Sequence, residues 1–132
     1  MNATGISILD DAGNLKLVLA NDDILKYYQW LIERETRYTI QRPRHGAHVN
    51  ILVRRWCVFN AAHIQHHLNI EVPFEYDPEN IRQGGSAARG FVNFYIPVKC
   101  EFGDNLLKEL HINYSNFLGF HFTIGSTKGV KK

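Results

Sequence analysis

The chain has 132 residues, which suits a single domain over residues 1–132 and needs no second hydrophobic core. Its formal net charge of +2 is too small for general binding to a long nucleic acid, so a nucleotide ligand needs a local site. There is no long apolar run, and the first ten residues lack a signal-peptide pattern. These features predict a cytoplasmic protein with no membrane partner, in which Cys57 and Cys100 are core thiols.

The first half of the chain predicts a hairpin, a helix and a third strand. Two alternating segments flank residues 11–14, whose Asp-Ala-Gly-Asn sequence favours a tight turn. Asn21 or Asp22 is expected to cap a helix with apolar residues at helical spacing. The expected strands and helix cover residues 5–10, 16–20, about 22–36 and 47–54.

The second half predicts a similar order of strands, helix and strand. A loop with one helical turn comes first, Asp104 is expected to cap the helix, and the glycine-rich segment 82–89 is expected to be a mobile connection. The other expected elements are strands at 70–76, 91–99 and about 119–126, followed by a frayed basic tail at 128–132. Together the two halves predict an α+β fold in which two antiparallel sheets form a central cleft, with helices outside.

Two of the expected strands carry the same polar pattern. His48 and Asn50 alternate with apolar residues in HVNI, and His121 and Thr123 do so in HFTI. Because side chains alternate along a strand, each pair lies on one face, opposite the buried residues. With similar halves, the two histidine strands are expected to face each other across the cleft. Taken singly, either histidine is more often a structural residue.

The ordered pair HVNI and HFTI resembles the signature of the two-histidine phosphoesterase superfamily, the LigT-like fold. The likeness covers roughly residues 40–128 and includes RPRHGAHVNILVRRW and GFHFTIGSTKG. It is most similar to a phage-encoded branch, the anti-CBASS nucleases, which degrade the cyclic oligonucleotide signals of bacterial CBASS immunity. The resemblance implies a pseudo-twofold fold and a phosphodiesterase that acts on cyclic oligonucleotides in immune evasion, without metal or cofactor.

The residue chemistry agrees with this interpretation. Cleavage of a ribose 3′ phosphodiester needs one group that takes the 2′-hydroxyl proton and another that protonates the leaving oxygen. Imidazoles, with a pKa of roughly 6.5, suit both roles, so His48 and His121 are the predicted acid and base. Thr123 and Asn50 are predicted to bind the phosphate. Asn50 departs from the superfamily pattern, which has Thr or Ser there.

Other residues are candidates for substrate binding. Arg54 is expected to attract phosphate, and Trp56 and Tyr95 are expected to stack on bases. Basic residues at 42, 44 and 55 also flank the first motif. The glycine-rich segment is either a lid over the ligand or a simple connection.

Two further interpretations stay open for the chain. One is an enzyme of 2′,3′-cyclic phosphate ends or RNA repair, and the other is a protein that sequesters a nucleotide without cutting it. For His63, His66 and His67, a divalent metal site is the alternative to a solvated loop. The loop is favoured because no nearby carboxylate or cysteine completes a familiar metal-binding pattern.

Overall fold

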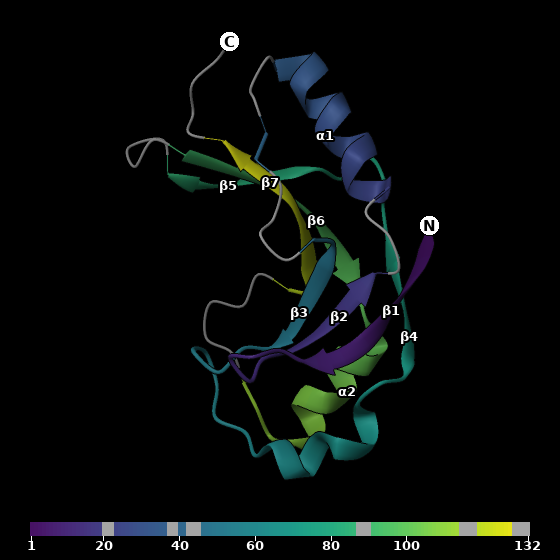
Figure 1. Ribbon diagram of the computed structural model, residues 1–132, viewed down its shortest axis with the longest axis vertical. Coiled ribbons are helices and arrows are strands. Elements are labelled where there is room, and N and C mark those ends of the chain that lie inside the picture. Colours follow the sequence, from purple (N-terminus) through teal and green to yellow (C-terminus); the bar gives the residue numbers. More distant parts are fainter. Residues whose placement is uncertain (20–22, 37–39, 42–45, 87–90, 114–118, 128–132) are drawn as a thin grey trace.

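The computed structural model describes the chain except residues 20–22, 37–39, 42–45, 87–90, 114–118 and 128–132 (Figure 1). The expected helix cap at Asn21 or Asp22, the basic residues 42, 44 and 45 and the basic tail therefore lie outside the described residues. The elements in chain order are β1 (Asn2–Leu9), β2 (Leu15–Leu19), α1 (Asp23–Thr36), β3 (His48–Leu52), η1 (Ala61–His67), β4 (Glu71–Tyr76), β5 (Arg82–Ser86), β6 (Phe91–Lys99), α2 (Glu101–Glu109) and β7 (His121–Thr127).

Six strands close into an antiparallel barrel in the order β4-β1-β2-β3-β7-β6. A short pairing between β4 and β6 completes the ring, through Glu75 with Lys99 and Tyr76 with Val98. The extra strand, β5, pairs with the first half of β6. In Figure 1, α1 lies at one end of the molecule and α2 lies at the other end, beside η1.

The predicted α+β fold with two antiparallel sheets around a central cleft is wrong. A single sheet closes on itself, and β3 and β7 are hydrogen-bonded neighbours in it rather than strands on opposite sides of a cleft. Alternation of side chains identifies strands, but it does not specify which strands pair. The ring depends on contacts such as that of Tyr76 with Val98, which no local pattern reports.

The expected strands, the first hairpin and the first helix are present with small changes in their bounds. Two local predictions are wrong. In the segment 82–89, which was expected to be a mobile connection, residues 82–86 form β5 because β6 supplies their backbone partners, and residues 87–89 lie outside the described residues. The second helix begins at Glu101 with Cys100 at its N-cap, so Asp104 lies inside the first turn. The expected helical turn in 56–69 is the 3₁₀ helix η1.

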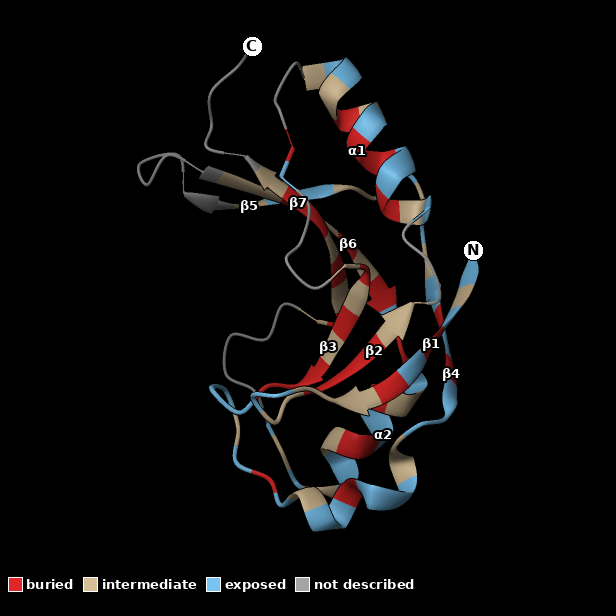
Figure 2. Cartoon of the chain, viewed as in Figure 1, coloured by how far each residue is buried: buried red, intermediate tan, exposed pale blue. Residues whose placement is uncertain are grey.

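The core lies inside the barrel and beneath α1. Leu17, Val49, Ile96 and Phe122 point inward from neighbouring strands and are each 0% exposed. Figure 2 shows one face of α1 buried, and its Tyr28 ring lies 6.5 Å from the Phe122 ring. Among the described residues, no helix is long and apolar enough to cross a membrane.

The two cysteines differ in their surroundings. Cys100 is buried, and this burial raises the pKa of its thiol. Cys57 is only half-buried, and its Sγ lies 3.4 Å from the carbonyl oxygen of Val53. The interpretation as a core thiol therefore describes Cys100 better than Cys57.

Helix α2 packs closely on the segment that leads into β7. A Cβ atom at Gly103 would overlap the ring of Phe120, which is only 4% exposed. The absence of a side chain at Gly103 thus lets α2 approach the residue directly before His121.

We expect Gly103→Ala to destabilise the protein. In an unconstrained helix this change stabilises by about 1 kcal/mol, but overpacking a core costs about 1–3 kcal/mol. The clash with a buried ring should outweigh the helix propensity. Urea unfolding measures the change, and Asn105→Ala at an exposed position of the same helix is the control. A more stable Gly103→Ala protein would contradict the close approach.

Candidate active site

The pairing of β3 with β7 brings the two polar motifs together. The strands are antiparallel, with Val49 across from Phe122. At the adjacent positions this register sets His48 across from Thr123, and Asn50 across from His121. All four side chains are half-buried and lie on the face opposite the core. We call these four residues the polar quartet.

The two histidines of the quartet are diagonal neighbours. Residues in diagonal positions of an antiparallel pair lie roughly 7–8 Å apart, whereas directly opposite residues lie closer. This spacing lets the two imidazoles act on different oxygens of one phosphodiester. The hydroxyl of Thr123 and the amide of Asn50 lie beside them as hydrogen-bond donors.

Each histidine is held by the same local device. The Nδ1 atom of His48 lies 2.9 Å from the carbonyl oxygen of Gly46, and Nδ1 of His121 lies 3.1 Å from the carbonyl oxygen of Gly119. Both glycines have positive φ angles, 74° and 87°, a region that favours glycine. The chain therefore contains two matched Gly-x-His units, one at the start of each motif strand.

The glycine carbonyls determine which tautomer each neutral imidazole adopts. A carbonyl oxygen only accepts hydrogen bonds, so Nδ1 must carry the proton that it donates. The lone pair of the neutral ring is then on Nε2, at the far side of the ring from the glycine. An imidazole held in this way can take a proton at Nε2, or deliver one from Nε2 when it is protonated.

The matched glycines were missed in the sequence, although the signal was visible. Both motif segments begin with a glycine two residues before the histidine, in GAHVNILV and GFHFTIGS. The residues between them, Ala47 and Phe120, are both buried. A repeated Gly-x-His spacing before alternating strands is therefore a signal for an oriented imidazole.

Tyr95, which the sequence analysis named as a candidate for base stacking, lies beside the quartet. It is across from Thr123 in the pairing of β6 with β7, and its ring centroid lies 5.1 Å from that of His121. On the other side, β5 sets Arg82 across from Tyr95. This row of neighbours extends the quartet with an aromatic ring and an exposed guanidinium group.

The contacts that the structure describes for Arg54 and Trp56 do not involve the polar quartet. The Arg54 guanidinium donates to the carbonyl oxygens of Gly13 at 3.1 Å and Phe59 at 3.2 Å, and so joins the first hairpin turn to the loop after β3. Trp56 is exposed beyond the end of β3, with the Arg55 guanidinium 5.7 Å from its ring. Neither residue is brought to the quartet by these contacts.

A buried lysine lies beside the quartet and was also missed. Lys16 of β2 is across from Asn50, and its Nζ lies 3.6 Å from Oδ2 of Asp10. Burial raises the pKa of Asp10, but the hydrogen bond from Asn14 and the charge of Lys16 outweigh it, so the pKa lies below its ordinary value. The sequence did carry a signal for this position: Lys16 lies between the apolar residues Leu15 and Leu17, and this alternation predicts that its side chain is on the outer face of the strand.

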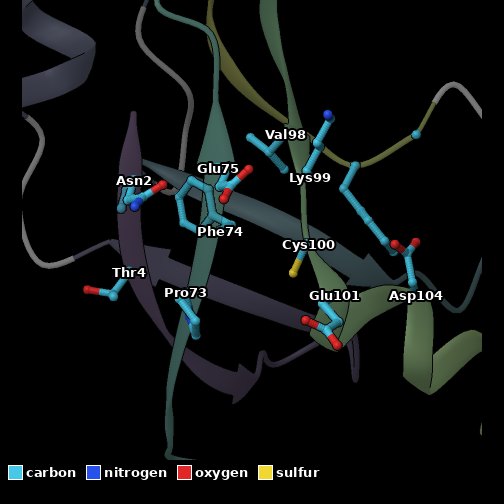
Figure 3. Close-up of a pocket in the computed structure, with 13 residues that line it drawn as sticks. Asn2, Thr4, Pro73, Phe74, Glu75, Val98, Lys99, Cys100, Glu101 and Asp104 are labelled. Carbon is cyan, nitrogen blue, oxygen red and sulfur yellow. The ribbon is translucent and has the colours of Figure 1, made fainter.

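A cavity of about 710 Å³ lies at the barrel seam, and its lining includes Gly119 and Phe120, the two residues directly before His121. Figure 3 shows its walls, with residues of β1 and β4 on one side and the end of β6 with the start of α2 on the other. Carboxylates of Glu75, Glu101 and Asp104 line it, but the predicted site residues do not. The quartet is therefore the better candidate for an active site.

Two of the three histidines that the sequence analysis expected in a solvated loop lie beside a carboxylate from a distant part of the chain. His66 and His67 of η1 lie near Glu109 at the end of α2, with ligand atoms that are all within 4.8 Å of one another. Among the residues that the structure describes, this is the one group of three side chains that could hold a metal ion. His63, on the same 3₁₀ helix, is exposed and lies outside it.

Comparisons of the chain with protein-family models, curated proteins and solved structures found no match.

We expect neutral His48 and His121 both to be protonated at Nδ1, because each donates to a glycine carbonyl. Long-range ¹H–¹⁵N correlation spectra of the imidazoles measure the tautomer directly. Gly119→Ala is an informative variant, since the positive φ is unfavourable for alanine. An added Cβ there meets no described atom within 4 Å. The tautomer of His121 should change while that of His48 stays; a neutral Nε2–H ring at both positions in the unmodified protein would contradict the geometry.

Proposed function

We propose that this chain is a metal-independent phosphodiesterase that cleaves the 3′–5′ linkages of a cyclic oligonucleotide. His48 and His121 serve as the general acid and base. The observation that supports this most strongly is the matched pair of Gly-x-His units on neighbouring strands. A single oriented histidine is common in structural roles, whereas two oriented on one face, each with a donor across from it, suit proton transfer at one phosphate.

The reaction begins with proton transfer to one neutral imidazole. Nε2 of that histidine takes the proton of the ribose 2′-hydroxyl, whose oxygen attacks the phosphorus and forms a bond to it. The bond from phosphorus to the 5′ oxygen breaks, and the second histidine, protonated at Nε2, gives its proton to that oxygen. Water then opens the resulting 2′,3′-cyclic phosphate with the two histidines in exchanged roles.

Asn50 and Thr123 are proposed to bind the non-bridging phosphate oxygens. Negative charge increases on these oxygens in the transition state, so a fixed donor stabilises it more than the ground state. The amide of Asn50 is longer than a hydroxyl and lacks the β-branch that stiffens threonine. Asn50 therefore holds the phosphate less rigidly than Thr123 does.

Tyr95 is proposed to orient His121 and to offer part of its ring to a base. Its ring contacts the imidazole, and Arg82 across from it is exposed, as a phosphate-binding group must be. A stacked base contributes about 1–3 kcal/mol with little dependence on its identity. Arg54 has no role in the proposal, because its guanidinium braces two loops.

The substrate class comes from the resemblance to the anti-CBASS nucleases, together with their phage context and role in immune evasion. The closed barrel differs from the fold that this resemblance implies, so the proposal depends on the chemistry of the quartet. Hydrolysis of 2′,3′-cyclic phosphate ends uses the same groups and is the second candidate. The quartet also fits a protein that only sequesters a nucleotide, and turnover separates that candidate from both enzymes.

We expect His48→Ala and His121→Ala each to lower turnover on the order of 10²–10⁴-fold, the usual loss for a general acid or base. Nucleotide binding should weaken much less, because Tyr95 and the phosphate donors remain. The measurement is chromatographic separation of products from a panel of cyclic di- and trinucleotides, cyclic-phosphate ends and single-stranded RNA. His63→Ala, an exposed histidine outside the quartet, is the control.

The same assay tests the chemical route. A cyclic oligonucleotide with 2′-deoxyribose at the cleaved linkage should bind and remain intact, since it lacks the attacking hydroxyl. Turnover should also persist in excess EDTA. Rapid cleavage of the deoxy analogue, or activity that stops in EDTA and returns with one divalent ion, would reject the two-histidine mechanism.

We expect Asn50→Ala to lower kcat more than it raises KM, because the lost donor acts mainly on the transition state. Asn50→Thr should keep or raise activity by placing a β-branched hydroxyl across from His121. Steady-state kinetics on the preferred substrate measure both variants. An Asn50→Ala enzyme with unchanged kinetics would remove this residue from the site.

A further inference from the structure

We infer that His66, His67 and Glu109 form a binding site for one divalent transition-metal ion of the zinc class. The site joins η1 to the last turn of α2, which lie side by side at the lower end of the molecule in Figure 1. It is separate from the polar quartet, which lies on β3 and β7.

The distances suit a shared ion. Nε2 of His67 lies 3.2 Å from Oε2 of Glu109, and the two imidazole centroids lie 3.9 Å apart. Zinc binds nitrogen and carboxylate oxygen at about 2.0–2.2 Å, which sets neighbouring ligand atoms roughly 3.0–3.5 Å apart. One pair already has this separation, and all the ligand atoms are within 4.8 Å of one another. Small side-chain rotations are enough to complete the site.

The donor set selects the class of ion. Two imidazole nitrogens and one carboxylate oxygen favour zinc, nickel or cobalt over magnesium and calcium, which prefer oxygen ligands throughout. Three protein ligands leave the remaining positions of the ion to water. The 3.2 Å contact of His67 with Glu109 accounts for two of these groups, but it does not account for the second imidazole packed against the first.

Several contacts hold the central ligand in place. The backbone carbonyl of His67 accepts a 2.6 Å hydrogen bond from the hydroxyl of Ser7, a buried residue of β1. The ring of His67 meets the ring of Phe102 edge-on at 5.7 Å. Asn60 caps η1 by accepting from the backbone N–H of Ala62. These contacts reduce the conformational entropy that His67 loses when it binds an ion.

Binding of an ion at this site should stabilise the end of the barrel that carries η1 and α2. His67 and Glu109 are 42 residues apart in sequence, so an ion held by both links two distant segments. An ion that binds the folded chain better than the unfolded chain stabilises the fold by mass action. The Gly103–Phe120 contact makes α2 part of the support of β7, so the added stability extends toward that strand.

The test is zinc titration of the tag-free, EDTA-treated full chain, by isothermal calorimetry and thermal unfolding. We expect one zinc ion per chain and a higher Tm with zinc, but no rise with magnesium. Loss of outer-shell partners weakens metal sites about 10–100-fold, so His66→Ala and Glu109→Gln, which remove direct ligands, should weaken zinc binding by at least about 100-fold. Both positions are exposed, so the variants should fold.

The matched control is His63→Ala, which removes an exposed imidazole from the same 3₁₀ helix and should leave zinc affinity unchanged. Absence of zinc binding by the unmodified chain would overturn the inference and leave only a surface pair of His67 with Glu109. Zinc affinity that is unchanged by Glu109→Gln, or lost equally in His63→Ala, would overturn it as well.

Discussion

The pairing of β3 with β7 is the constraint on which the candidate site depends. Val49 and Phe122 meet in this pair, and both are 0% exposed inside the barrel. A slip of one residue would turn these apolar side chains outward and the histidines inward, at a large cost in buried apolar surface and buried polar groups. The hydrophobic core therefore sets the alignment of the two histidines on the opposite face of the strands.

Closure of the barrel adds rigidity to that alignment. Neither β3 nor β7 is an edge strand of the sheet, because each has a paired neighbour on both sides, with β2 beside β3 and β6 beside β7. Within the ring, the two positive-φ glycines turn a carbonyl toward each imidazole. The pairing of the strands thus determines where each histidine lies, and the carbonyl of the glycine two residues before it determines how its ring is oriented.

The two ends of the molecule have different chemistry. The polar quartet uses neutral donors and imidazoles on an open strand face, whereas the cluster around Glu109 brings two imidazoles to a carboxylate between helices. The close approach of Gly103 to Phe120 connects these regions mechanically, since α2 supports the residue before His121.

Periodicity is a local property of the chain, so it was enough to predict the strand at 91–99 with its observed bounds, the helix near 23–36 and the two polar motifs. The position of β3 beside β7 in a barrel could not be predicted in this way, because strand pairing and ring closure join residues that are distant in the sequence. For the same reason the sequence did not indicate Glu109 as a partner of His67, because the two residues are 42 positions apart in the chain. Arg54 is the opposite case. It lies close to the first motif in the sequence, but in the folded chain its guanidinium donates hydrogen bonds to two loops instead.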